Sequence, residues 1–477
     1  MSVRRRHYNV TLGVLTLAAT TYALQQTMVV PALPVIERDL DTSTTWVTWV
    51  FTGFLLSAAV LTPILGKLGD QFGKERLLVV SLGLFFLGSL GCAFSWSVGS
   101  LIAFRVASGA GAAVFPLSFG IIRDEFPHEK VKVGMGLLSA VFGIGGGFGL
   151  VFSGVITDHA SWRWLFVAGA IPVALAVVLV HRFVPESPVR SVSRVDVPGA
   201  LLMSATLISF LVALTEGGSW GWGSPATLGL FAASIVLGTA FVLVEKRVEA
   251  PLIDMDVFVE RPVLLTNITA VIAGFAMFGA FSLVPRFIET PKGLAPSIAA
   301  DVQYGFGASA TRAGLYLLPM SVTMLVAGPV AGLLGRRFGS KWPLSAGMAF
   351  VAAATALLAT KHEHLWQVTT AMVVLGVGAA FAFASMPALI SEAVLPTETG
   401  IATGINTVMR TIGGVVGGQI GASILTSSVI AHTSVPTEHA YTIVFAVASA
   451  SALIGAIVAA RVTRAEPKLS PISARAG

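Results

Sequence analysis

The fold is decided by a glycine-rich, charged stretch that joins two apolar runs: Gly66-Lys67-Leu68-Gly69-Asp70-Gln71-Phe72-Gly73-Lys74-Glu75-Arg76. Its glycines permit close backbone packing and positive φ, as a tight turn between two membrane helices requires. The basic side chains of Lys67, Lys74 and Arg76 favour a position on the cytoplasmic side of the membrane. Asp70 is an acid in a basic turn, so it needs a partner, which a helix N-terminus or an arginine would supply.

The same pattern returns in the second half of the chain as Gly332-Leu333-Leu334-Gly335-Arg336-Arg337-Phe338-Gly339-Ser340-Lys341. Three glycines and one phenylalanine keep their spacing, and Pro63 corresponds to Pro329, at a constant offset of 266 residues (332 minus 66). Arg336 stands where the first copy has its acid, so the two turns differ in charge. A duplication of this length predicts a transporter built from two related helical bundles.

The first copy resembles the loop signature G-x-L-x-D-x-x-G-R/K-x-x-x-L of the major facilitator superfamily. Gln71 and Glu75 depart from it, because the family often has basic residues at these positions. The resemblance implies a secondary transporter in which two six-helix bundles alternately open a central cavity to either side of the membrane.

The composition excludes a soluble globular protein. Hydrophobic residues make up 55% of the chain and charged residues 11%, and the mean hydropathy is +0.84, which is typical of a polytopic membrane protein. The net charge of +6 is interpreted as basic loops facing an anionic leaflet rather than as nucleic-acid binding. The single cysteine, Cys92, excludes an intramolecular disulfide.

Apolar runs of membrane length predict an all-α fold with fourteen transmembrane helices. The predicted spans are 10–30, 46–68, 77–95, 99–122, 133–156, 164–182, 198–215, 225–244, 263–285, 311–335, 343–360, 366–391, 402–428 and 440–461. The first is interpreted as a helix rather than a signal peptide, because it exceeds the usual core of about 7–15 residues. With both termini in the cytoplasm, 22 of the 30 Lys and Arg lie inside and six outside, as the positive-inside rule expects.

The repeat divides the chain into an N-terminal six-helix bundle (1–182), a linker with two extra transmembrane helices (183–261), a C-terminal six-helix bundle (262–461) and a cytoplasmic tail (462–477). Two helices inserted between the bundles are similar to the fourteen-helix drug:proton antiporter branch of the superfamily. That resemblance implies residence in the bacterial inner membrane.

Four polar side chains are candidates for substrate binding or coupling. The stretch from Leu24 to Pro34 resembles the branch pattern L-D-x-T-I-V-N-V-A-L-P, but Gln25 replaces its acid and cannot titrate. Gln25 and Gln26 either contact substrate or form hydrogen bonds between helices. Arg105 resembles the buried arginine of the fourth helix, for which the family implies a coupling role, unless it only reaches the membrane surface. Arg410 lies near the middle third of its span and needs a partner.

A gate is predicted around the first turn. Its members are Gly66, Asp70, Gly73, Lys74, Arg76 and Asp124. Asp124 is expected to pair with Arg76 or Lys74 and to hold the bundles closed in one state, the alternative being a solvated run of charges. Glycines four residues apart predict close helix approach at the bundle interface. They are Gly143, Gly147, Gly149, Gly413 and Gly417.

We expect proton-coupled export of lipophilic drugs or a small natural product, with a monomer as the family's usual form and no enzymatic activity. The chain contains no Walker sequence, nucleophile elbow or Cys/His cluster, so no cofactor, metal or nucleic acid is predicted. Arg105 with an outer acid, Glu37 or Glu289, is the candidate coupling group. The alternatives are an uptake or facilitated-diffusion carrier and a membrane sensor that does not transport.

Overall fold

The computed structural model describes residues 8–189, 196–290, 304–430 and 435–463, which are almost entirely helical. The first half contains α1 (Tyr8–Met28), η1 (Val30–Ala32), α2 (Leu33–Asp39), α3 (Thr44–Phe72), α4 (Lys74–Ala93), α5 (Val98–Ser108), η2 (Gly109–Ala113), α6 (Val114–Glu125), α7 (His128–His159) and α8 (Arg163–Phe183). Then follow α9 (Val197–Trp220), α10 (Pro225–Glu245) and α11 (Met255–Val259). The second half contains α12 (Arg261–Glu289), α13 (Ala310–Phe338), α14 (Lys341–Thr360), α15 (Leu365–Ala393), η3 (Pro396–Glu398), α16 (Thr399–Ser427) and α17 (Glu438–Ala460).

Local sequence explains where several of these helices begin and end. The Ser43 hydroxyl caps α3 by accepting the Trp46 N–H, and Ser97 forms a capping box at the start of α5. Gly73 separates α3 from α4 with φ of 117°, and Gly339 separates α13 from α14 with φ of 88°. Both values lie in the region that favours glycine. The two copies of the repeated sequence therefore make equivalent helix–turn–helix corners.

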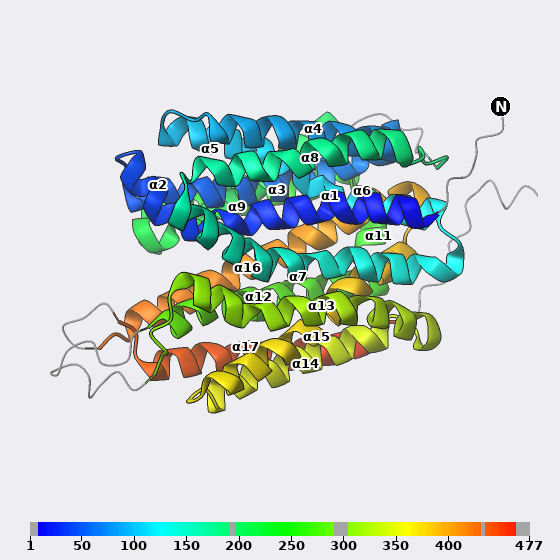
Figure 1. Cartoon of the computed structure of the whole chain (residues 1–477). Helices are drawn as coiled ribbons and strands as arrows, with labels where there is room; N and C mark the ends of the chain where they lie inside the picture. Colours follow the sequence, from blue (N-terminus) through cyan, green and yellow to red (C-terminus); the bar gives the residue numbers. More distant parts are fainter. Residues whose placement is uncertain (1–7, 190–195, 291–303, 431–434, 464–477) are drawn as a thin grey trace, which may run out of the picture.

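The helices before α9 and those after α11 form two groups with matching internal pairings. In the first group α1 packs against α7 and α8, while α4 packs against α5 and α8. In the second group α12 packs against α16 and α17, while α14 packs against α15 and α17. Each group has its own large apolar core, and the groups lie above and below one another in Figure 1. The predicted domain boundaries at 182, 262 and 461 stay predictions.

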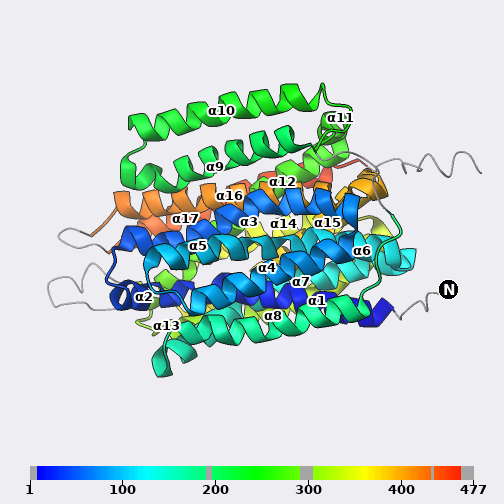
Figure 2. The same ribbon diagram turned by 90° about the horizontal axis from the view of Figure 1, so that it is seen from above.

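Helices α9 and α10 form a hairpin outside these two groups, as Figure 2 shows. Helix α9 packs against α3 and α16, and α10 packs against α9. The outer helix α10 exposes large apolar side chains such as Ile235 and Val236. Such a surface is stable when it faces lipid hydrocarbon.

Twelve helices in the described ranges are long and apolar enough to cross a membrane, rather than the fourteen that the sequence predicts. Helix α1 is not among them, since threonines and Gln25 and Gln26 reduce its hydropathy. Helix α12 is not among them either, and its segment Arg261–Met277 is a shorter apolar helix. The predicted span 99–122 is also not one regular helix, because the glycine- and alanine-rich segment Gly109–Ala113 forms a 3-10 turn within it.

Candidate functional site

Asp70 links the first group of helices to the second at the end where both repeated corners lie. Its carboxylate is completely buried and accepts the backbone N–H groups of Gly400, at 3.2 Å, and Ile401, at 3.1 Å. These two N–H donors belong to the first turn of α16 and have no acceptor within the helix, and the helix dipole favours an anion there. The partner of Asp70 is therefore a helix N-terminus, one of the two kinds considered from sequence. We call this end of the molecule the inner end.

Lys74 connects Asp70 to a second buried acid. Its ammonium nitrogen lies 3.3 Å from the Asp70 carboxylate and 2.8 Å from that of Asp124. All three side chains are almost completely buried. Because both acids share one cation within the first group of helices, this cluster fixes the position from which Asp70 reaches α16.

Arg76 does not pair with Asp124, which corrects one of the two pairings considered from sequence. It lies 3.7 Å from Glu186 instead. The Glu186 carboxylate also accepts the backbone N–H groups of Glu75 and Arg76 at 3.2 and 3.4 Å, so it caps α4. A Cβ at Gly73 would collide with this carboxylate. Glu186 lies more than a hundred residues after the turn in sequence, so local reading could not identify it.

Two further basic residues of the first group of helices form bonds to the second group at the inner end. The Arg123 guanidinium donates to the carbonyl oxygens of Val394 (2.8 Å) and Leu395 (3.1 Å) and to the Thr399 hydroxyl (2.5 Å). Lys132 donates to the Gly335 carbonyl oxygen at 3.1 Å and lies 2.6 Å from the Glu392 carboxylate. Together with the contacts of Asp70, these bonds form what we call the inner latch.

Glycines bring helices of the two groups into contact along two seams. A Cβ at Gly66 of α3 would lie 2.6 Å from the Gly400 carbonyl oxygen of α16. A Cβ at Gly143 of α7 would lie 2.6 Å from the Met324 Cβ of α13, and one at Gly147 would collide with Ser321. These positions tolerate no side chain unless the helices separate.

Three other glycines predicted at the bundle interface pack within their own group, which corrects that placement. Gly149 faces Thr27 of α1, while Gly413 and Gly417 face α12. Residues two apart on a helix differ by about 200° in direction, so Gly147 and Gly149 point to opposite neighbours. Likewise Gly413 is rotated by about 220° from Gly400, which faces α3.

Arg105 is buried among aromatic side chains. Its Nε donates to the Val50 carbonyl oxygen at 3.1 Å, and its Cζ lies 4.0 Å from the centre of the Phe54 ring. Its Nη1 and Nη2 are buried and have no hydrogen-bond partner among the residues that the structure describes. The cation–π contact offsets part of the cost of burying this charge.

Arg410 occupies a similar environment at the junction of the two groups. Its Cζ lies 4.5 Å from the ring centre of Phe142, on α7, and 4.3 Å from that of Phe383, on α15. Stacked and T-shaped ring pairs connect Phe142 to Phe54, the ring beside Arg105, through Phe115 and Tyr22. This central aromatic layer was not predicted, because its rings come from five helices and each looks like an ordinary apolar position.

Gln25 is buried. Its Oε1 accepts the Ser89 hydroxyl at 2.6 Å, and its amide packs against Gly169. These contacts favour the interpretation as a polar link between helices, while Gln26 is half-buried. Glu37 lies in α2, and Glu289 is the last residue of α12.

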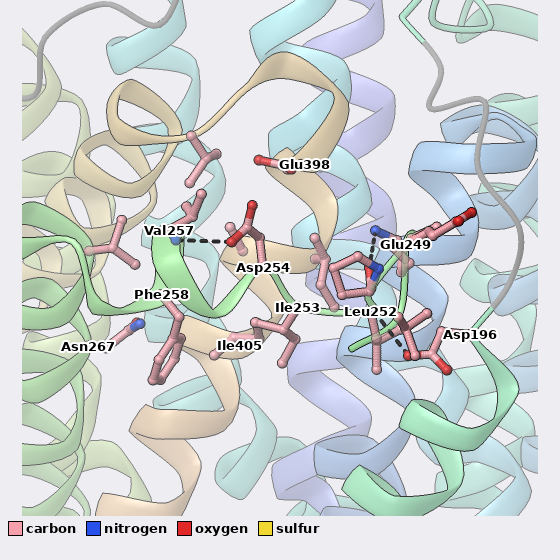
Figure 3. Close-up of a pocket in the computed structure, with 18 of the residues that line it drawn as sticks. Asp196, Glu249, Leu252, Ile253, Asp254, Val257, Phe258, Asn267, Glu398 and Ile405 are labelled. Atoms are coloured by element: carbon pink, nitrogen blue, oxygen red, sulfur yellow. Dashed lines mark hydrogen bonds between the residues drawn. The ribbon is translucent and has the colours of Figure 1, made fainter. Parts of the chain in front are cut away.

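A pocket of about 940 Å³ lies at the inner end beside the α9–α10 hairpin (Figure 3). The segment from Val248 to Asp254 forms much of its wall, together with α16. Lys67 donates to the Pro251 carbonyl oxygen at 3.0 Å, and Asp196 accepts the Leu252 N–H at 3.4 Å. This segment thus connects the start of α9 to the first repeated corner. No motif indicated this pocket, because its lining comes from four separate segments.

No metal centre is found in the part of the chain that the structure describes. The polar atoms of two neighbouring histidines are used in other contacts. The His362 ring nitrogens lie 2.6 Å from the Leu358 carbonyl oxygen and 2.7 Å from the Glu438 carboxylate. The backbone N–H of His364 donates to Gln367.

Comparisons with known proteins show which family this chain resembles. Residues 15–300 and 270–477 match the sequence family described as Major Facilitator Superfamily. The chain is 30% identical over 363 residues to the tetracenomycin C resistance and export protein of Streptomyces glaucescens, an alignment covering 75% of this chain and 65% of that protein. It is 30% identical over 397 residues to multidrug resistance protein 3 of Bacillus subtilis (strain 168), covering 82% and 74%.

A solved structure shares the fold. The crystal structure of the human organic anion transporter MFSD10 (TETRAN) superimposes with a TM-score of 0.66 at 14% identity, covering 94% of this chain and 99% of that chain. This similarity concerns the fold alone.

Proposed function

The chain belongs to the major facilitator superfamily, and from this premise we propose that it exports lipophilic drugs or a small natural product by alternating access, driven by the proton gradient. Names of relatives support export, since they are a resistance and export protein and a multidrug resistance protein. We propose further that the protein works as a monomer in the lipid bilayer. It would carry a small molecule and perform no catalysis.

The observation that carries the proposal is the inner latch. Asp70, Arg123 and Lys132 each bond to a helix of the other group, and all these contacts lie at one end of the molecule. Most of the bonds are to backbone atoms at helix ends, so they can be released together without breaking a helix. A latch of this kind suits a carrier whose two bundles rock between two arrangements, each of which closes one end of the molecule.

We propose that the chain crosses the bacterial inner membrane fourteen times. Both of its termini would then lie in the cytoplasm. Tyr8, at the start of α1, packs against Phe126 near the latch, with ring centres 5.7 Å apart. Helix α17 ends beside the start of α14, where the Ser345 hydroxyl donates to Ala456. Helix α1 spans about 31 Å, as a crossing needs, and α12 is longer. These two helices complete the proposed fourteen, with α9 and α10 as the inserted pair.

Everted membrane vesicles test the proposal. Respiration acidifies their interior, and a transported drug that exchanges for protons should dissipate part of that gradient while it accumulates inside. Drug entry down its own concentration gradient, at a rate that does not change when the proton gradient is abolished, would indicate facilitated diffusion. Specific drug binding with no flux under any gradient would indicate a sensor. Either result would contradict proton-driven export.

A further inference from the structure

Arg410 lies at the centre of the molecule, where the two groups of helices meet. It is 11 residues from the start of α16, or about 17 Å from the inner end of that helix. Phe142 on one side belongs to the first group, and Phe383 on the other belongs to the second. The Cζ atom lies over both rings, at 4.5 Å from the centre of Phe142 and 4.3 Å from that of Phe383.

In the part of the chain that the structure describes, neither central arginine has an acidic partner. Within the described ranges no ion pair or hydrogen bond joins any residue to the Arg410 guanidinium, although only 9% of this residue is exposed. Two nitrogens of Arg105 are likewise unpaired. Every Asp and Glu of the described helices lies within five residues of a helix end. The central layer therefore carries two positive charges and no carboxylate, an arrangement that is costly inside a membrane.

We propose that Arg410 recognises a carboxylate on a substrate with a planar apolar body, an inference that rests on the export function proposed above. A carboxylate can accept two parallel N–H donors from the free edge of a guanidinium. The planar body would pack on the neighbouring rings, which include the stacked pair Phe115 and Phe142, 4.1 Å apart. The substrate thereby supplies the negative charge that the central layer lacks.

The position of Arg410 relates this recognition to transport. Gly274 of α12 packs against the backbone of Arg410 so closely that a Cβ there would collide with its carbonyl oxygen. The backbone of Arg410 is therefore fixed in the second group, while Phe142 moves with the first. Rocking of the two groups changes the distance between guanidinium and ring, and with it the site that the carboxylate occupies.

A matched pair of fluorescent probes tests the proposal with the purified full-length protein in nanodiscs. Pyrenebutyrate and 1-pyrenebutanol share an aromatic body, and only the first is anionic at neutral pH. The wild type is expected to bind pyrenebutyrate at least about tenfold more tightly, since a hydrogen bond to a charged group supplies that difference. Arg410→Gln should abolish the preference while still binding the alcohol, which also shows that the variant is folded.

Arg461→Gln is the matched control, because it removes the same charge from an exposed position outside the centre. It should keep the preference. Arg410→Lys, which retains the charge but not the planar fork, should reduce the preference several-fold even if the glutamine variant fails to fold. Equal affinities for both probes in the wild type would overturn the proposal, as would an unchanged preference in both Arg410 variants.

Transport of the same probes separates this inference from the export function. If everted vesicles accumulate neither probe while the purified protein still prefers the carboxylate, export is refuted and the anion site stands. If the vesicles export the alcohol while neither binding nor flux favours the carboxylate, the anion site is refuted and export stands.

Discussion

Replacing Asp70 by Asn is expected to weaken the inner latch without unfolding the protein. The substitution keeps one acceptor oxygen for α16 but removes the charge that the Gly400 and Ile401 N–H groups bind. A charge-assisted hydrogen bond contributes about 2 kcal/mol, and this contribution is present only while the inner end is closed. The ratio of inside-open to inside-closed protein should therefore rise roughly 30-fold, and transport should slow because the inner end no longer closes firmly.

The accessibility of an engineered cysteine measures this ratio. Thr62 is buried where α3 meets Gly404 of α16, so a cysteine there is shielded until the inner end opens. In a Cys92→Ala background, a membrane-impermeant maleimide applied to everted vesicles should label Thr62→Cys much faster when Asp70 is also Asn. Asp158→Asn, at an exposed position at the other end of α7, serves as the control. Equal labelling rates with Asp70 and with Asn would refute the role of the latch.

The remaining predictions concern other parts of the same end and the opposite end. Gly400→Val should abolish drug flux but not membrane insertion, because a Cβ there would lie 2.6 Å from the Gly66 carbonyl oxygen; normal flux would show that this seam never closes. Glu186→Ala should lower the melting temperature by removing the cap of α4, worth about 1 kcal/mol, and an unchanged melting temperature would exclude that role. Hydrogen bonds from Trp162 and Arg163 hold the pKa of Asp39 below its ordinary value. Its stabilising effect should be present above about pH 4 and be lost as pH falls through the lower pKa of the folded state. The difference in melting temperature between Asp39→Asn and the wild type should therefore be largest near pH 6 and shrink as pH falls below about 4, and a difference that stays constant with falling pH would contradict this assignment.

The sequence predicted the features that depend on local pattern or on the repeat. The glycines of the two corners recur at one spacing, and Gly73 and Gly339 both adopt positive φ. An acid in a basic turn has few possible partners, and a helix N-terminus was one of those considered for Asp70. The all-helical membrane fold follows from composition in the same way.

Features that depend on the relative rotation of helices could not be predicted. Gly147 and Gly149 look alike in sequence, yet they face different helices because two residues turn the direction by about 200°. Arg123 appeared to be part of a charged helix end, and its partners at 394–399 lie about 270 residues away. The aromatic rings around Arg410 carry no motif, since only the packing of α7 against the second group brings Phe142 to it.

Alternating access is tested most directly by two distances measured in one sample series with paired spin labels. One pair, at Arg76 and Arg336, spans the two repeated corners at the inner end, and the other, at Asp158 and Lys361, spans the opposite end; all four residues are exposed. When drug is added or the pH is changed, the inner distance should lengthen as the outer distance shortens. Distances that stay fixed under all conditions, or that change in the same direction at both ends, would contradict a rocking carrier.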